Sequence, residues 1–132
     1  MFPKDFVWGV ASSAYQVEGT DAKDGRGKNI WDEFARSGRV YEHQTAEVCC
    51  DHMHRYREDF ALMRMVGIKN YRFSINWSRI LPEGTGKVNE KAVQMYRDMI
   101  LCMKENGIRP FITLFHWEFP YELFKKRRLA ER

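Results

Sequence analysis

The chain has 132 residues, of which 44% are hydrophobic and 30% are charged, and its formal net charge is +4. This length and composition suit one domain with a soluble globular core. They exclude a membrane-spanning helix, because no apolar run approaches the ~18 residues that such a helix needs, and the N-terminal MFPKDFVWGV lacks the apolar core of a signal peptide.

The first predicted element is a short strand over Phe6–Ala11, with the sequence FVWGVA. A loop that carries Gln16 and Glu18 follows this strand. The whole segment, WGVASSAYQVEG, is neither a G-x-G-x-x-G turn nor a phosphate-binding loop with its lysine. The sequence therefore argues against an open nucleotide-binding sheet.

The next predicted element is an amphipathic helix. Its apolar stripe has alternating steps of four and three residues and consists of Cys49, Met53, Tyr56, Phe60 and Met63. The expected N-cap is Thr45, and the expected residue just beyond the helix end is Gly67.

A second amphipathic helix is predicted between Asn89, its expected N-cap, and Gly107, which ends it. Its apolar stripe consists of Val93, Tyr96, Ile100 and Met103. A last helix is predicted over Pro120–Arg132.

The two amphipathic helices are followed by the same pattern. GIKNYRFSINW begins at Gly67 and GIRPFITLFHW begins at Gly107, and both contain Gly, Ile, a basic residue, an aromatic residue and a closing Trp at matching positions. Short apolar strands that alternate with helices indicate parallel βαβ units. The predicted fold class is therefore α/β, either an open doubly wound sheet or a (β/α)8 barrel.

The cysteines and histidines do not indicate a disulfide or a metal site. Cys49 and Cys50 are adjacent and cannot bridge easily, and the odd total with Cys102 suggests reduced thiols in the cytoplasm. His52 and His54 lie near the cysteine pair, but the four side chains do not share one helix face. No metal and no cofactor is predicted.

In parallel α/β folds the functional residues lie at the carboxyl ends of the strands. The polar and aromatic residues after the predicted strands are Gln16, Glu18, Asn76, Trp77, His116 and Trp117. Amides and neutral imidazoles donate and accept hydrogen bonds, as neutral hydroxyls require, and indole faces can cover a sugar ring. The set favours a carbohydrate over a phosphate, although core packing would also explain a tryptophan and a structural hydrogen bond would explain a histidine.

Arg72 lies inside the second predicted strand, where parallel strands are normally apolar. A buried guanidinium is costly unless a carboxylate pairs with it. Glu18 on the first loop is the nearest candidate partner. Otherwise Arg72 faces the solvent-exposed rim, or its partner lies outside this sequence.

Several stretches together resemble glycoside hydrolase family 1, the β-glucosidase family. FVWGVASSAYQVEG is similar to the N-terminal signature of that family, and DGRGKNIWDEF, YRFSINWSRILPEGTGKVNEKAV and PFITLFHWEFP resemble its following segments in the same order. The resemblance runs from Phe2 to Phe124. It implies a partial (β/α)8 TIM barrel that contains the first three βα units, with residues 1–132 as a single N-terminal fragment.

The resemblance also implies roles for individual residues. Gln16, His116 and Trp117 would line the glycone subsite, which holds the sugar whose bond breaks. Arg72 would donate a hydrogen bond to the catalytic nucleophile. Asn76 stands where many members have serine and receives no role.

Members of the family hydrolyse β-glycosides with retention, using two glutamates ~5–5.5 Å apart. In the family these glutamates stand in Asn-Glu-Pro and Glu-Asn-Gly motifs that follow later strands. Asn-Glu-Pro does not occur in this chain, and its one Glu-Asn-Gly, at 105–107, lies at the end of the second predicted helix and not at the end of a strand. We therefore expect part of a β-glucosidase that carries no catalytic residue and does not hydrolyse glycosides alone. Whether the sugar is a glucoside, a galactoside or a 6-phospho-glycoside is left open.

Two alternatives remain at this point. The chain could be an interaction module that associates with itself or with a complementing fragment through an exposed barrel core. It could also be an active glycosidase in which Glu18 or Glu118 acts as an unconventional acid. Glu118 and Phe119 replace the Asp and Leu that are commoner in the family.

The final residues, RRLAER from Arg127, stand where family members commonly have Gly-Gly-Trp-Leu-Asn. The codons GGC GGC TGG CTG AAC, read one base earlier after A or C, encode Arg-Arg-Leu-Ala-Glu. We therefore expect a frameshift near codon 127, with 127–132 as an accidental tail. The basic run at Lys125–Arg128 is interpreted as a solvated helix face, because no nucleic-acid-binding fold accompanies it.

Overall fold

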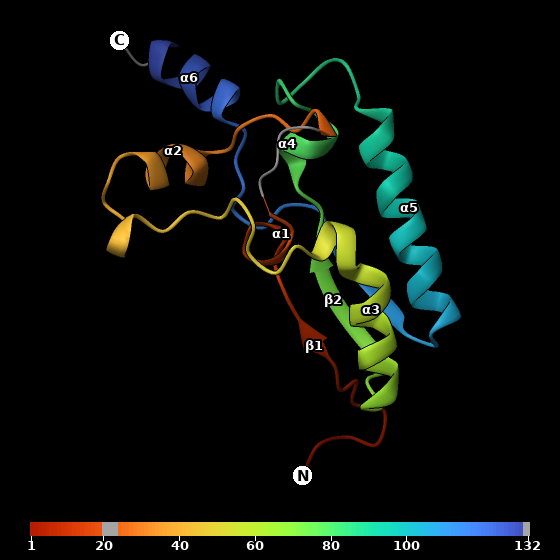
Figure 1. The fold of residues 1–132 in the computed structure, drawn as a ribbon. Coiled ribbons are helices and arrows are strands. Elements are labelled where there is room, and N and C mark those ends of the chain that lie inside the picture. The colour runs from red at the N-terminus through yellow and green to blue at the C-terminus, as the bar shows by residue number, and fades with distance from the viewer. Residues whose placement is uncertain (20–23, 131–132) are drawn as a thin grey trace.

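The computed structural model describes residues 1–19 and 24–130 (Figure 1). Along the chain the elements are β1 (Val10–Ala11), α1 (Ala14–Val17), α2 (Ile30–Arg36), the 3-10 segment η2 (Tyr41–His43), α3 (His52–Met65), β2 (Asn70–Ser74), α4 (Trp77–Ile80), α5 (Glu90–Glu105), β3 (Arg109–Thr113) and α6 (Tyr121–Ala130). The predicted alternation of strands and helices is confirmed.

The three strands form one parallel sheet in the order β1-β2-β3. β2 and β3 pair in register along their whole length, from Asn70 opposite Arg109 to Ser74 opposite Thr113. Because the pairing is parallel, the carboxyl ends of the strands meet at one edge of the sheet.

β1 is shorter than the predicted strand FVWGVA. Two residues, Val10 and Ala11, pair with β2. Before them the carbonyl of Trp8 accepts a hydrogen bond of 2.6 Å from the Asn70 side chain instead of a backbone amide. At Gly9 a Cβ atom would lie 2.5 Å from the Asn70 carbonyl oxygen, so the close approach of the two backbones requires glycine.

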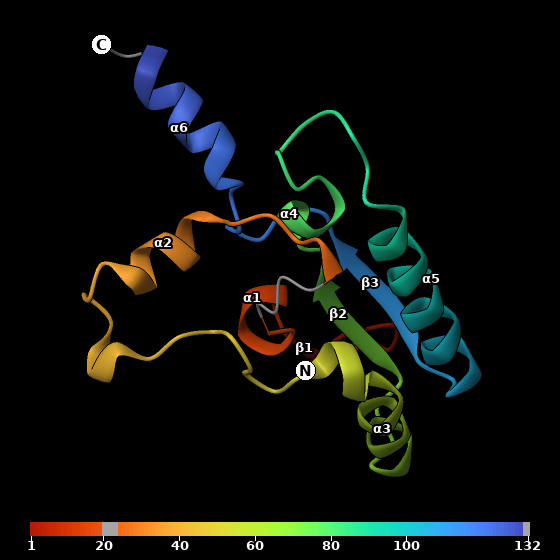
Figure 2. The same cartoon turned by 45° about the horizontal axis from the view of Figure 1, so that its top comes forward.

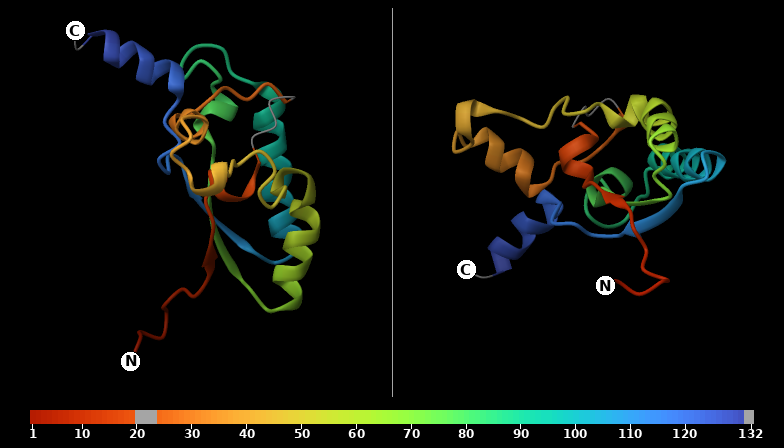
Figure 3. Two further views of the ribbon diagram at one scale, coloured as in Figure 1. Left: turned by 60° about the vertical axis from the view of Figure 1, so that its left-hand side comes forward. Right: turned by 90° about the horizontal axis from the view of Figure 1, so that it is seen from below.

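The hydrophobic core lies between the sheet and two helices. Figure 3 shows α3 and α5 on the same side of the strands. The buried members of this core are Met53, Tyr56, Phe60, Tyr71, Phe73, Tyr96, Met99, Cys102, Met103 and Ile108. Tyr71 and Phe73 alternate along β2, face the helices together, and stack with their ring planes 18° apart.

The repeated Gly-Ile pair ends α3 and α5 in the same way. After α3 the N–H of Ile68 donates to the carbonyl of Met63, and the N–H of Gly67 donates to the carbonyl of Arg64. The equivalent two bonds recur around Gly107 after α5. Both glycines have positive φ, 83° and 69°, which this helix-ending motif requires of its penultimate residue.

The start of the first predicted helix was wrong. α3 begins at His52, after Asp51 at φ 50°, and neither Thr45 nor Cys49 belongs to it. Cys49 is exposed and also has positive φ, so the backbone turns there and cannot continue a right-handed helix towards Thr45.

The second predicted helix is confirmed as α5. The side chain of Asn89 accepts a hydrogen bond of 3.4 Å from the N–H of Ala92, as an N-cap does. The buried stripe lies slightly to one side of the predicted one: Tyr96 and Met103 are buried as predicted, while Val93 and Ile100 are half-buried.

The short helices α1, α2 and α4 were not predicted from the sequence. α2 begins with a capping box, in which the Asn29 side chain accepts from the N–H of Asp32 and Asp32 accepts from the N–H of Asn29. The spacing of these two residues was a usable signal. α1 and α4 have four residues each, too few to show a helical period.

α6 stands away from the sheet (Figure 2) and carries the basic run. Lys125 pairs with Glu122 at 2.6 Å and lies over the ring of Tyr121, and Lys126 and Arg127 are exposed. The last two residues of the predicted helix and of the expected tail, 131 and 132, lie outside the described residues.

None of the helices in the described part of the chain is long and apolar enough to cross a membrane. The cytoplasmic location that the cysteine count suggests stays a prediction.

The other face of the sheet has no helix over it in the part of the chain that the structure describes (Figure 3). Arg72 and Phe111 lie opposite each other on this face and both are exposed. Beyond them the end of β3 leads into Leu114, which is 76% exposed, and Phe115, which is 43% exposed. A sheet face without a covering helix, exposed apolar side chains on and beside it, and open strand edges favour association.

We expect the isolated 132-residue chain to self-associate by burying this face between two copies. Sedimentation velocity at tens of micromolar should show dimers or larger species. Phe111→Lys should shift the distribution towards monomer, because it places a charge at the centre of the face. Leu101→Lys, at an exposed position on α5, is the matched control and should not. A well-behaved monomeric parent chain would contradict the expectation.

Candidate functional site

The residues that the sequence singled out lie at the carboxyl edge of the sheet (Figure 1). Gln16 is on α1 directly after β1, Asn76 precedes α4 after β2, and His116 with Trp117 follows β3. The predicted placement of these residues after the strands is therefore found in the structure.

Two hydrogen bonds attach the turn that carries Gln16 to β2 and to the segment that follows β3. The N–H of Ala14 donates to Ser74 Oγ, at the end of β2, at 2.7 Å. The N–H of Tyr15 donates to Glu118 Oε1, after β3, at 3.1 Å. The Gln16 side chain itself is exposed. The backbone next to Gln16 is thus tied directly to the residue that follows Trp117.

Trp117 has an unusual backbone that presents its indole to solvent. Its φ is 77°, which is uncommon for a residue with a side chain, and the residue is 67% exposed. Its carbonyl accepts hydrogen bonds from the indole N–H of Trp31 at 3.1 Å and from the N–H of Phe119 at 2.8 Å. Strained backbone held by such contacts is typical of ligand sites.

Arg72 does not have the carboxylate partner that was considered for it. Its Nε donates to Thr113 Oγ1 at 3.0 Å and its Nη2 lies 2.9 Å from His116 Nδ1. Glu18, the nearest candidate in the sequence, was the wrong partner, because it pairs with Arg79. Arg72 is exposed, which fits both remaining alternatives, a solvent-facing side chain and a partner outside this sequence.

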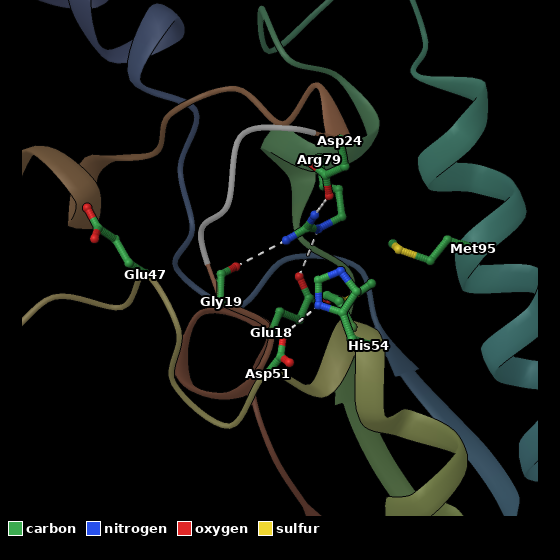
Figure 4. Close-up of a pocket in the computed structure, with 9 residues that line it drawn as sticks. Glu18, Gly19, Asp24, Glu47, Asp51, His54, Arg79 and Met95 are labelled. Carbon is green, nitrogen blue, oxygen red and sulfur yellow. Dashed lines mark hydrogen bonds and ion pairs between the residues drawn. The ribbon is translucent and has the colours of Figure 1, made fainter.

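Glu18 and Arg79 form a buried ion pair beneath the carboxyl edge (Figure 4). Arg79 Nε donates to Glu18 Oε2 at 3.1 Å, and both side chains are 2% exposed. Arg79 also donates to the carbonyl of Gly19 at 3.1 Å and pairs with Asp24. The hydroxyl of Tyr96, from α5, donates to Glu18 Oε1 at 2.6 Å. This network joins the turn after β1 to α4 and α5.

The pKa of Glu18 is raised above its ordinary value, mainly because the carboxyl is buried. The Arg79 charge and the hydrogen bond from Tyr96 offset part of this rise. The nearby carboxylate of Glu118 raises the pKa further. Both glutamates are almost fully buried, at 4% and 1% exposure. These contacts argue against the alternative in which Glu18 or Glu118 acts as a catalytic acid, because neither side chain can reach a substrate.

Two strand-end candidates serve packing in this structure. Asn76 is buried, and its N–H donates to the hydroxyl of Tyr96 at 2.9 Å. The Trp77 indole N–H donates to the carbonyl of Gly84 at 3.0 Å, and its ring meets Phe115 edge-on. Trp77 therefore has a packing role, which is the simpler interpretation of a tryptophan at a strand end.

Over residues 1–19 and 24–130, no group of three or more His, Cys, Asp or Glu side chains is arranged to hold a metal ion. His52 pairs with Asp59 and His54 pairs with Asp51, each at 2.6 Å. The two histidines near the cysteine pair are therefore engaged by carboxylates.

The family model for glycosyl hydrolase family 1 matches residues 1–131. Beta-glucosidase A of Acetivibrio thermocellus is 52% identical over 126 residues, which are 95% of this chain and 28% of that protein. Beta-glucosidase A of Thermotoga maritima is 46% identical over 132 residues, 99% of this chain and 30% of that protein. The chain thus spans about three tenths of the length of these relatives.

Solved structures of a β-glucosidase also match almost the whole of this chain and about three tenths of their own length. The Thermotoga maritima β-glucosidase in complex with glucoimidazole superposes with a TM-score of 0.91 at 46% identity, covering 98% of this chain and 30% of that chain. The same enzyme in complex with cyclophellitol gives a TM-score of 0.90 over 96% of this chain and 29% of that chain.

Replacing Arg79 tests the buried network. We expect Arg79→Met to lower the free energy of unfolding at pH 7 by about 3–5 kcal/mol, because the Glu18 charge stays buried without its partner. A carboxyl whose pKa is raised in the folded state stabilises the fold below its unfolded pKa, and this stabilisation is lost as the pH rises. The loss should therefore be smaller at pH 5 than at pH 7 in urea denaturation.

Two further variants make this measurement interpretable. Glu18→Gln combined with Arg79→Met should recover part of the lost stability, since no buried charge remains at position 18. Arg55→Met, which breaks an exposed pair with Glu58, is the matched control and should have little effect. A destabilisation by Arg79→Met that is equal at both pH values would contradict the assignment.

Proposed function

The chain belongs to glycosyl hydrolase family 1, and we propose that it supplies the first three βα units of a (β/α)8 barrel that hydrolyses β-glycosides with retention. Within that barrel it would form part of the wall that holds the sugar. The observation that carries the proposal is the hydrogen bond from the Tyr15 N–H to Glu118, which joins the Gln16 turn to the turn with His116 and Trp117.

The proposed sugar-holding residues are Gln16, His116 and Trp117. The Gln16 amide can donate to one hydroxyl and accept from another, and the His116 imidazole offers a further polar contact. The exposed indole of Trp117 offers an apolar face to the C–H side of a pyranose ring. They follow β1 and β3, two strands of one parallel sheet, and this placement supports a joint role at one edge of the sheet.

The proposed role of Arg72 is to donate a hydrogen bond to a catalytic carboxylate. Arg72 is exposed on the sheet face that a closed barrel would enclose. The nucleophilic glutamate of a retaining glycosidase would come from a later strand, and the guanidinium would hydrogen-bond to it. Asn-Glu-Pro is absent from these 132 residues, and their one Glu-Asn-Gly, at 105–107, lies at the end of α5 and not at the end of a strand. The chain would therefore take part in catalysis without performing it.

The substrate class follows from the relatives and is proposed at the level of β-glucosides. The relatives named above are β-glucosidases.

A second candidate function is a module without catalysis that associates with a partner. The uncovered sheet face and the two open strand edges favour it. The partner would be a second copy or a polypeptide that contributes the remaining βα units. This candidate and the first differ in whether the completed assembly hydrolyses a glycoside.

We expect no hydrolysis of nitrophenyl β-glucoside by the purified chain, because both carboxylates of the retaining mechanism are missing. Release of nitrophenol would be followed by absorbance at protein concentrations up to tens of micromolar. Activity above a blank that survives repurification would overturn the expectation.

Adding the part of Thermotoga maritima Beta-glucosidase A that this chain does not cover should produce hydrolysis. His116→Ala in the same mixture should lower kcat/KM about tenfold, as expected for the loss of one good hydrogen bond. Leu101→Lys on the outer surface of α5 should leave kcat/KM unchanged. A stable complex of the two polypeptides without hydrolysis would favour the module over the enzyme part.

A further inference from the structure

The contact between Arg72 and His116 decides which nitrogen of this imidazole carries its proton. Arg72 Nη2 lies 2.9 Å from His116 Nδ1. A guanidinium has five N–H donors and no acceptor, so the histidine nitrogen that faces it must accept. A nitrogen that accepts a hydrogen bond carries no proton, so the single N–H of the neutral ring is on Nε2.

The guanidinium is held in place for this contact. Arg72 Nε donates to Thr113 Oγ1 at 3.0 Å, while Nη2 donates to the imidazole. Thr113 ends β3 opposite Ser74 of β2, and His116 follows three residues later. The register of the two strands thus sets both contacts, and the planar arginine spans from one strand to the turn after the other.

Two other histidines in the chain have the opposite arrangement. His52 Nδ1 lies 2.6 Å from Asp59, and His54 Nδ1 lies 2.6 Å from Asp51. A carboxylate accepts hydrogen bonds, so each of these Nδ1 atoms carries a proton. The chain therefore contains its own reference for the alternative tautomer.

We propose that Arg72 is a positioning residue that holds His116 as the neutral Nε2–H tautomer. His116 then presents an N–H donor at its outer nitrogen, and the group it recognises is a hydroxyl oxygen acting as acceptor. The identification of that hydroxyl with a sugar rests on the proposed function, whereas the tautomer itself does not. This role for Arg72 is additional to the nucleophile contact that the family resemblance implies.

The test is a nitrogen-15 NMR spectrum of the imidazoles of the full 132-residue chain at pH 8. Ring nitrogens with and without a proton have well-separated shifts, and their correlations to the two carbon-bound ring protons identify the tautomer. His116 should show a protonated Nε2 and an unprotonated Nδ1. His52 and His54 should show a protonated Nδ1.

Arg72→Met should move both His116 ring nitrogens towards the averaged shifts of an unconstrained histidine. Arg72→Lys, which keeps a cationic donor, should restore part of the original pattern. Arg109→Met removes another exposed arginine, from β3, and should leave His116 unchanged. Because Arg72 is exposed, these variants should keep the fold, which the His52 and His54 signals report.

A protonated His116 Nδ1 in the parent chain would overturn the proposal, and so would His116 signals that do not respond to Arg72→Met. Titration with glucose separates this outcome from the proposed function. A shift of His116 Nε2 on adding glucose supports sugar binding. No shift, with the tautomer as expected, would leave the Arg72 role intact and count against the sugar site in the isolated chain.

Discussion

The buried pair of Glu18 and Arg79 is the contact on which the carboxyl edge of the sheet depends. Its members lie 61 residues apart in sequence, and both side chains are almost completely removed from water. Two charges in such a place are tolerated only when further hydrogen bonds satisfy them. The carbonyl of Gly19 and the hydroxyl of Tyr96 supply those bonds and bring in the turn after β1 and helix α5.

The proposed sugar-holding residues depend on the network of Glu18 and Arg79 indirectly, through the turn after β1. Gln16 lies on the turn that Glu18 ends, and the same turn is fastened to the segment after β3 through Glu118. Two buried glutamates therefore act as fixed acceptors beneath exposed side chains. An acidic residue near a predicted sugar site suggests catalysis in a sequence, but burial and the hydrogen bonds that Glu18 and Glu118 accept give them a structural part here.

The two faces of the sheet have contrasting chemistry. Towards α3 and α5 the strands contribute Tyr71 and Phe73 to a continuous apolar core. The opposite face presents Arg72 and Phe111, a charge and an aromatic ring on neighbouring strands. A polar group such as Arg72 can point into a barrel only where hydrogen-bonding partners meet it, and Thr113 and His116 already provide part of that environment.

The sequence by itself determined the features that depend on near neighbours. The helix α5 with its Asn89 cap, the glycine that ends each long helix, the parallel strands and the resemblance to family 1 could all be predicted, because each is encoded within a few residues or in a motif. Only the tertiary structure decided the partners of Arg72 and Glu18, the start of α3 and the four-residue helices α1 and α4. Arg72 and His116 are 44 residues apart, and which of several distant acceptors a cation meets depends on strand register and burial, which no local pattern specifies.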